Sequence, residues 1–175
     1  MSAEVSQIWQ AHWQPASAFA LAAPFRDWLL NTESLTARLK ALPGEFSLQL
    51  CLEQPLNLPA PLASRWQCAQ GVVREVVLKV DAKPCVYAQS LLPISTVQAL
   101  TPLASLGEKP LGEFIFQQPG LQRGAIEIAH FAQGLPALGL QTSLYGRRSF
   151  FSLDSHELLV QELFLPGFIQ SCNAT

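Results

Sequence analysis

Charged residues are scarce in this sequence, since Asp, Glu, Lys and Arg make up only 14% of 175 residues and the net charge is −2. The chain therefore lacks the basic surface that a phosphate backbone requires, and we expect no nucleic-acid partner. No uninterrupted apolar run approaches the ~20 residues of a membrane-spanning helix, so no span is predicted. The first basic residue is Arg26, so the positively charged start of a secretory signal is missing and a cytoplasmic protein is expected.

Motifs for metal, nucleotide and nucleophile chemistry are missing as well. The cysteines form no C-x-x-C pair and the histidines show no metal-ligand spacing, which argues against zinc, iron–sulfur and thioredoxin-like sites. No G-x-S-x-G, P-loop or G-x-G-x-x-G sequence occurs, so acyl hydrolysis, nucleotide binding and dinucleotide cofactors lose their usual support. We therefore expect neither a metal nor a cofactor. The residues concerned are Cys51, Cys68, Cys85, Cys172, His12, His130 and His156.

Hydrophobic residues, in contrast, make up 49% of the chain. This richness indicates a large core, an apolar pocket, or both, and a chain of this size can bury about 70% of its unfolded surface. No internal repeat and no linker divides the sequence. Residues 1–175 are therefore predicted to form a single domain, in which residues 1–24 show no clear periodicity and form an uncertain lead-in.

Periodic patterns predict short helices and antiparallel strands. Apolar residues recur at helical spacing in some segments and alternate with polar residues in others. Turn-forming clusters at residues 81–84 and 154–156 join two pairs of strands into hairpins, and Ser95 with Gln98 has the spacing of a capping box. The predicted helices span residues 25–30, 31–42 and 95–107, the last interrupted at Pro102. The predicted strands span residues 46–52, 72–80, 85–92, 125–131 and both arms of a hairpin at 145–166.

A proline-rich stretch interrupts this pattern after the first strand. Pro55, Pro59 and Pro61 are expected to prevent regular structure as far as Ala63, which predicts a loop or flap. The segment 109–116 fits either a helix or a strand. Hairpin-linked strands with helices grouped in the first half and the middle predict an α+β fold, with one antiparallel sheet and helices packed on one face.

Two charged side chains lie on otherwise apolar strand faces. Because side chains alternate between the faces of a strand, Arg74 and Glu162 each share a face with hydrophobic residues alone. A charge on such a surface needs a hydrogen-bond partner or a counter-ion, because burying a bare charge is costly. The neighbours on the face of Arg74 are Val72, Val76, Leu78 and Val80, and those of Glu162 are Leu158, Val160 and Phe164.

Each of these features has two interpretations. Arg74 and Glu162 either pair directly across the sheet, or line a pocket where Arg74 clamps a ligand carboxylate and Glu162 hydrogen-bonds a ligand hydroxyl. Arg147 and Arg148 either contact an anion or form a solvated strand end, and a basic pair beside a loop is more often the latter. The pocket interpretation describes a site for a small carboxylated and hydroxylated ring.

Six short blocks together resemble chorismate pyruvate-lyase. They occur in the family's order and cover most of the chain from about residue 25, and they are specific jointly rather than singly. The blocks are Asp27-Trp28-Leu29-Leu30 with Ser34-Leu35-Thr36, Val73-Arg74-Glu75-Val76, Leu92-Pro93-Ile94-Ser95-Thr96, Lys109-Pro110-Leu111-Gly112, Gly146-Arg147-Arg148-Ser149 and Glu162-Leu163-Phe164-Leu165-Pro166.

The resemblance implies a cofactor-independent lyase that converts chorismate to 4-hydroxybenzoate and pyruvate, the entry to ubiquinone biosynthesis. It also implies an antiparallel sheet with helices on one side and flaps over an internal ligand pocket. By the same resemblance, Arg74 holds the ring carboxylate, Glu162 faces the ring hydroxyl, and backbone groups at Leu35 and Leu111 line the pocket. Leu35 stands where the family pattern has methionine, a change that a backbone contact tolerates.

Further expectations concern the second carboxylate, product release, an alternative function and the oligomeric state. Arg147 or Arg148 is a candidate for the second carboxylate of chorismate, and a product sealed under flaps is expected to inhibit. The alternative is a non-catalytic module that binds an aromatic carboxylate, because effector domains of one large group of bacterial transcription regulators resemble this fold. A monomer is expected, since no spare amphipathic stripe is evident.

Overall fold

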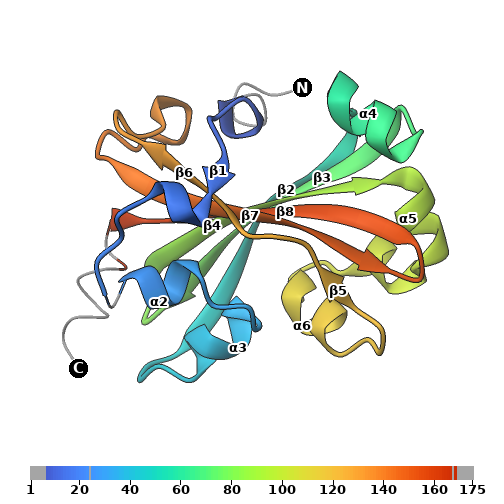
Figure 1. Cartoon of the computed structure of the whole chain (residues 1–175). Helices are drawn as coiled ribbons and strands as arrows, with labels where there is room; N and C mark the ends of the chain where they lie inside the picture. The colour runs from blue at the N-terminus through green and yellow to red at the C-terminus, as the bar shows by residue number, and fades with distance from the viewer. Residues whose placement is uncertain (1–6, 24, 167, 169–175) are drawn as a thin grey trace.

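The computed structural model describes residues 7–23, 25–166 and 168, so Cys172 and the ends of the predicted domain lie outside the described residues. Eight strands form one antiparallel sheet in the order β1-β6-β7-β8-β4-β3-β2, with β5 paired to β7 (Figure 1). The strands are β1 (Gln14–Pro15), β2 (Phe46–Asn57), β3 (Gln70–Val80), β4 (Lys83–Pro93), β5 (Gln122–Arg123), β6 (Glu127–Phe131), β7 (Leu144–Leu153) and β8 (His156–Phe164). The helices are α2 (Phe25–Leu29), α3 (Leu35–Lys40), α4 (Ala60–Trp66), α5 (Ile94–Ala99) and α6 (Leu111–Phe116), with 3-10 turns at η1 (Ala16–Ala18), η2 (Thr101–Ser105) and η3 (Pro136–Leu138).

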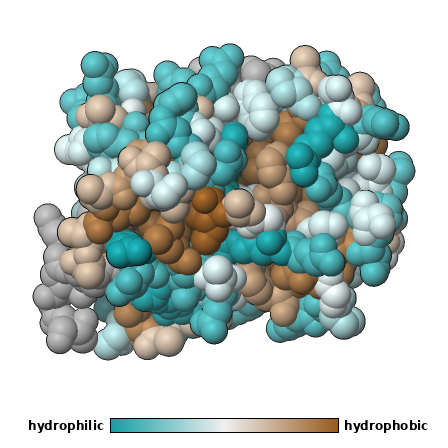
Figure 2. Space-filling view, in the orientation of Figure 1, coloured by the Kyte–Doolittle hydropathy of each residue, from teal (hydrophilic) through white to brown (hydrophobic). Residues whose placement is uncertain are grey.

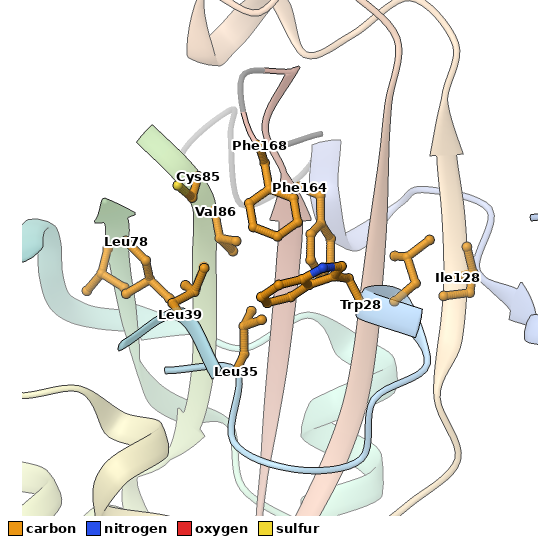
Figure 3. Close-up of a cluster of buried hydrophobic side chains, with 12 residues drawn as sticks. Trp28, Leu35, Leu39, Leu78, Cys85, Val86, Ile128, Phe164 and Phe168 are labelled. Carbon is orange, nitrogen blue, oxygen red and sulfur yellow. The ribbon is translucent and has the colours of Figure 1, made fainter. Parts of the chain in front are cut away.

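Most of the helical mass covers one face of the sheet. Helices α2 and α3 bury Trp28, Leu35 and Leu39 in a cluster with side chains of β3, β4 and β8, where Trp28 meets the ring of Phe168 edge to face at 4.8 Å (Figure 3). Helix α6 buries Ile115 in a neighbouring cluster on the same face. These contacts confirm the predicted α+β fold with one antiparallel sheet, and α2, α3 and α6 pack on one of its faces.

The opposite face carries less helix. Leu62 of α4 packs there against Val73 and Leu159, and the chain near Ile8 covers Leu163. Four buried clusters together account for much of the hydrophobic composition, while Figure 2 shows the remaining hydrophobic surface as patches among hydrophilic side chains. Within the described residues, no helix is long and apolar enough to cross a membrane.

Both predicted hairpins are confirmed. Asp81 and Ala82 join β3 to β4, and Asp154 and Ser155 join β7 to β8. All four residues have positive φ, from 48° to 69°. Tight turns of this kind match the right-handed twist of the strands that they join. The observed turns have two residues each, so the strands begin sooner after the turn than the sequence predicted.

The predicted loop at Pro55–Ala63 is wrong. Strand β2 continues through Pro55 to Asn57, and α4 starts at Ala60 with Pro61 in its first turn. Proline is tolerated at both places, because β2 is the edge strand of the sheet and the first amides of a helix need no intrahelical acceptor. A register shift between Leu50 and Leu52 also leaves Cys51 exposed on this edge.

Helix starts differ from the predicted ones for local reasons. The helix predicted from residue 31 begins at Leu35, because the hydroxyl of Ser34 accepts a hydrogen bond from the amide of Ala37. The predicted capping box is wrong, since α5 begins at Ile94 and Ser95 lies inside it without a capping bond. The undecided segment 109–116 contains α6, and the uncertain lead-in supplies β1, which pairs with β6.

A row of polar side chains crosses the face that lies opposite α2 and α3. Consecutive hydrogen bonds join Gln89 Nε2 to Glu75 Oε1 at 3.0 Å, and Gln161 Nε2 to Gln89 Oε1 at 2.9 Å. Arg148 and Glu127 continue the row on β7 and β6. A slip of one residue would move every one of these groups to the apolar face, so the row helps to fix strand register.

Gly146 is a glycine because its neighbours leave no space for a side chain. A Cβ atom there would lie 2.6 Å from Cδ2 of Leu163 and 3.2 Å from the rings of Phe131 and Trp13. We therefore expect Gly146→Val to lower the free energy of unfolding by about 1–3 kcal/mol and the melting temperature by roughly 2–12 °C. The measurement is thermal unfolding followed by circular dichroism.

Gly112→Ala is the matched control for this substitution, because a Cβ on α6 would meet Thr36 Oγ1 at an ordinary 3.4 Å. Alanine also suits a helix better than glycine, so its melting temperature should stay equal or rise. Equal melting temperatures for Gly146→Val and the unsubstituted protein would contradict the packing argument.

Candidate active site

A cavity lies between the sheet and the helices α3 and α6. It encloses about 580 Å³ when the open space at its mouth is counted. Strand β3 contributes Arg74, β5 Arg123, β7 Arg147 and β8 Glu162. The rest of the lining is mainly apolar, with Leu35, Leu48, Val76, Leu78, Ala88, Leu111, Ile115, Phe116, Phe151 and Val160. The cavity thus surrounds a few charges with hydrophobic walls.

Two hydrogen-bond partners fix the guanidinium of Arg74. Its Nη1 lies 2.5 Å from Glu53 Oε2, and its Nη2 donates to the carbonyl of Lys109 at 3.0 Å. The side chain of Arg74 is only 3% exposed, whereas that of Glu53 is 28% exposed. The suggested direct pair between Arg74 and Glu162 is therefore wrong, since each has a different counter-ion.

Glu162 pairs with Arg147, its direct partner across the β7–β8 hairpin. Arg147 Nε lies 2.6 Å from Glu162 Oε2, and the arginine side chain is 1% exposed. Its Nη1 also donates to the carbonyls of Trp28, Leu29 and Asn31 at 3.1, 3.2 and 2.7 Å. Carbonyls at the end of a helix such as α2 have no intrahelical donor, so they can accept these bonds. The expectation of a solvated strand end is thus wrong for Arg147.

Arg148 lies on the other face of the sheet. Its Nε donates to Glu127 Oε2 at 2.7 Å, and its guanidinium lies 5.5 and 5.0 Å from the ring centres of Trp9 and Trp13. Neighbouring residues of a strand point to opposite faces, so only one member of the Arg147-Arg148 pair reaches the cavity. We therefore omit Arg148 from the candidate site.

Arg123 was missed by the sequence analysis. Its Nε donates to Ser149 Oγ at 3.0 Å and its Nη1 to the carbonyl of Asn31 at 3.2 Å. Burial, and then the nearby charge of Arg147, lower the pKa of Arg123 to about 10, while Glu162 opposes the shift. Among the described residues, Arg123 forms no ion pair, unlike Arg74 and Arg147.

Leu35 and Leu111 mark the places where two helices start at the cavity. Leu35 is the first residue of α3 and Leu111 the first of α6, and both line the cavity. Amides in the first turn of a helix have no intrahelical acceptor, so they are available to a ligand. The resemblance had assigned backbone contacts to both positions.

The arrangement suits an anionic ring. Arg74 and Glu162 lie on the same face of the sheet. Arg74 is in register with Ser90 of β4, and Glu162 is in register with Ala88, the next residue of β4 on that face. Arg147 and Arg123 lie at the Glu162 end. Within the described part of the chain, no three His, Cys, Asp or Glu side chains are grouped to hold a metal ion.

Comparison with known sequences identifies a family to which the chain is similar. Residues 7–172 match the family model described as chorismate lyase. A relative named "probable chorismate pyruvate-lyase", from Pseudoalteromonas translucida, is 45% identical over 167 residues that cover 90% of this chain and 93% of that protein. A relative with the same name from Psychromonas ingrahamii is 35% identical over 173 residues, or 93% of this chain and 91% of that one.

Comparison with solved structures supports the fold. The effector domain of PhnF from Mycobacterium smegmatis has a TM-score of 0.59 at 19% identity, and the match covers 79% of this chain and 91% of that one. The ligand-binding domain of a GntR-family transcriptional regulator from Bordetella bronchiseptica has a TM-score of 0.52 at 19% identity, with 72% and 87% covered. At such identity the likeness concerns the fold alone.

Proposed function

The chain belongs to the chorismate lyase family, and from this premise we propose that it converts chorismate to 4-hydroxybenzoate and pyruvate. The observation that carries the proposal is the placement of Arg74 and Glu162 in one apolar cavity, each oriented by a partner of its own. A para-substituted ring with a carboxylate at one end and a hydroxyl at the other matches such a pair of groups.

We propose that Arg74 binds the ring carboxylate. Glu53 and the Lys109 carbonyl already fix its guanidinium, so little side-chain freedom is lost when a ligand binds. Leu35 and Leu111 line the same cavity, and we propose that their backbone groups and the apolar walls contact the ligand. Arginine suits this task because its planar fork matches the two oxygens of a carboxylate.

We propose that Glu162 acts at the C4 hydroxyl of chorismate. The reaction removes the proton on C4 and breaks the bond between C3 and the ether oxygen. The electrons of the C4–H bond complete the aromatic ring, and enolpyruvate leaves and takes up a proton to become pyruvate. Glu162 Oε2 is bound to Arg147, while Oε1 accepts no hydrogen bond from another described residue. That oxygen can accept the hydroxyl proton in a hydrogen bond, as a general base or as a polarising group.

Aromatisation supplies most of the driving force, so positioning and electrostatics are the main tasks of the protein. We propose a cytoplasmic, monomeric enzyme that needs neither metal nor cofactor and that opens ubiquinone biosynthesis. The proposed product site lies beneath α3 and α6, and we expect slow release and product inhibition.

The test is to mix the purified protein with chorismate in buffer that contains EDTA, and to follow pyruvate and 4-hydroxybenzoate together. We expect both products in equal amounts, at a rate that falls as 4-hydroxybenzoate is added beforehand. Absence of turnover, with 4-hydroxybenzoate still bound in calorimetry, would contradict the enzyme and support a non-catalytic binding module of the same fold.

A further inference from the structure

Chorismate carries two carboxylates, and Arg74 accounts for only one of them. The second belongs to the enolpyruvyl group on C3, beside the C4 hydroxyl and away from the ring carboxylate on C1. If the hydroxyl lies at Glu162, the second carboxylate must lie at the Glu162 end of the cavity. A buried carboxylate needs a cation or several hydrogen-bond donors there.

Two arginines are at that end, and they differ in what they already bind. The charge of Arg147 is already balanced by Glu162, and its Nη1 donates to three main-chain carbonyls, so only Nη2 remains available to a ligand. Arg123 has no acidic partner among the described residues. Only two of its five N–H groups have acceptors in the described chain, namely Ser149 Oγ and the Asn31 carbonyl.

A shared acceptor fixes Arg123 beside the Glu162 pair. Nη1 of Arg123 and Nη1 of Arg147 both donate to the carbonyl oxygen of Asn31, at 3.2 and 2.7 Å. Ser149, which accepts from Arg123 Nε, is two residues from Arg147 and on the same strand face. Arg123 is thus rigidly held, lines the cavity, and has unused donors next to the group proposed to act on C4.

We propose that Arg123 binds the enolpyruvyl carboxylate of chorismate and so distinguishes this dianionic substrate from the monoanionic product. The inference rests on the proposed lyase function. Burial and the nearby charge of Arg147 lower the pKa of Arg123, so its charged form is disfavoured. A bound anion would stabilise that charged form. After the reaction, pyruvate leaves with its carboxylate, so Arg123 loses its ligand while Arg74 keeps the ring carboxylate.

Equilibrium binding tests the proposal without turnover. The probes are 4-hydroxybenzoate, with one carboxylate, and 3-(carboxymethoxy)-4-hydroxybenzoate, a stable aromatic dianion with an ether at the same ring position as chorismate. Arg123→Gln should weaken the dianion about 10- to 100-fold and leave 4-hydroxybenzoate within about threefold. Arg123→Lys, which keeps the charge, should recover part of the loss. Arg74→Gln should weaken both ligands.

Three results would overturn the inference. Equal weakening of both ligands by Arg123→Gln would assign Arg123 a structural role, as would a loss that Arg123→Lys does not recover. If Arg123→Gln binds both ligands with the affinity of the unsubstituted protein, Arg123 is not part of the site. The lyase proposal is judged separately, because conversion of chorismate by the unsubstituted protein is measured without either probe.

Discussion

Replacing Glu162 with glutamine is expected to lower kcat for chorismate about 10²- to 10⁴-fold, the usual contribution of a positioned acid or base. Glutamine has nearly the same shape and still offers an oxygen to Arg147 Nε, which lies 2.6 Å from the carboxylate in the present structure. It has no basic carboxylate, however, and it leaves the buried Arg147 charge without compensation. The measurement is the initial rate of pyruvate formation at saturating chorismate.

Glu127→Gln is the matched control, because Glu127 pairs with Arg148 Nε at 2.7 Å on the opposite face of the sheet. It should change kcat less than about twofold, since it removes an equivalent ion pair outside the cavity. The size of the Glu162→Gln effect also separates the two roles. If Glu162 only polarises the hydroxyl, glutamine should lower kcat less than about tenfold. If Glu162 is a general base, the fall in kcat should be about 10²- to 10⁴-fold. Unchanged kcat would exclude both roles.

Strand alternation explains why part of the site could be predicted. Arg74 and Glu162 each sit in a long apolar strand, where a period of two residues alone decides which side chains share a face. Both line the observed cavity, as in the pocket interpretation, one of the two that this pattern allowed. The helices could be predicted less well, because a single cap at Ser34 or a proline before Ile94 moved their first residues.

The pairing of Arg147 with Glu162 could have been predicted from the turn. A two-residue turn at Asp154–Ser155 pairs Leu153 with His156, and counting back along both strands brings Arg147 opposite Glu162. The predicted turn included His156, and that difference of one residue obscured the register. Register is the property of a hairpin that depends most directly on turn length.

Arg123 and Glu53 could not be found in this way. Strand β5 has only two residues, so no periodic pattern marks it, and Arg123 gains its burial from Ser149 and the Asn31 carbonyl far away in sequence. Glu53 stands just before Pro55, in a stretch whose prolines favoured a loop. Its role depends on the register shift between Leu50 and Leu52, which brings Glu53 opposite Arg74 and which strict alternation does not predict.

Replacing Arg74 with alanine is expected to lower the affinity for 4-hydroxybenzoate, and kcat/KM for chorismate, about 30- to 1,000-fold, as is typical when one partner of a buried charged pair is removed. The reason is that Arg74 is the cavity arginine whose Nη atoms are both fixed, by Glu53 and the Lys109 carbonyl. Arg65→Ala is the control, since Arg65 pairs with Glu157 on the surface, outside the cavity.

A neutral ligand shows whether the lost interaction is with the carboxylate. The unsubstituted protein should prefer 4-hydroxybenzoate strongly to 4-hydroxybenzamide, which has the same shape without the charge, and Arg74→Ala should abolish most of this preference. Removing Arg74 also leaves Glu53 without its counter-ion, so the double variant Glu53→Gln/Arg74→Gln is needed to restore neutrality at this site. If the double variant folds with an unchanged melting temperature and still prefers the carboxylate, Arg74 does not bind it. If the preference disappears in both variants, the ring carboxylate lies at Arg74 and the orientation of the ring toward Glu162 follows.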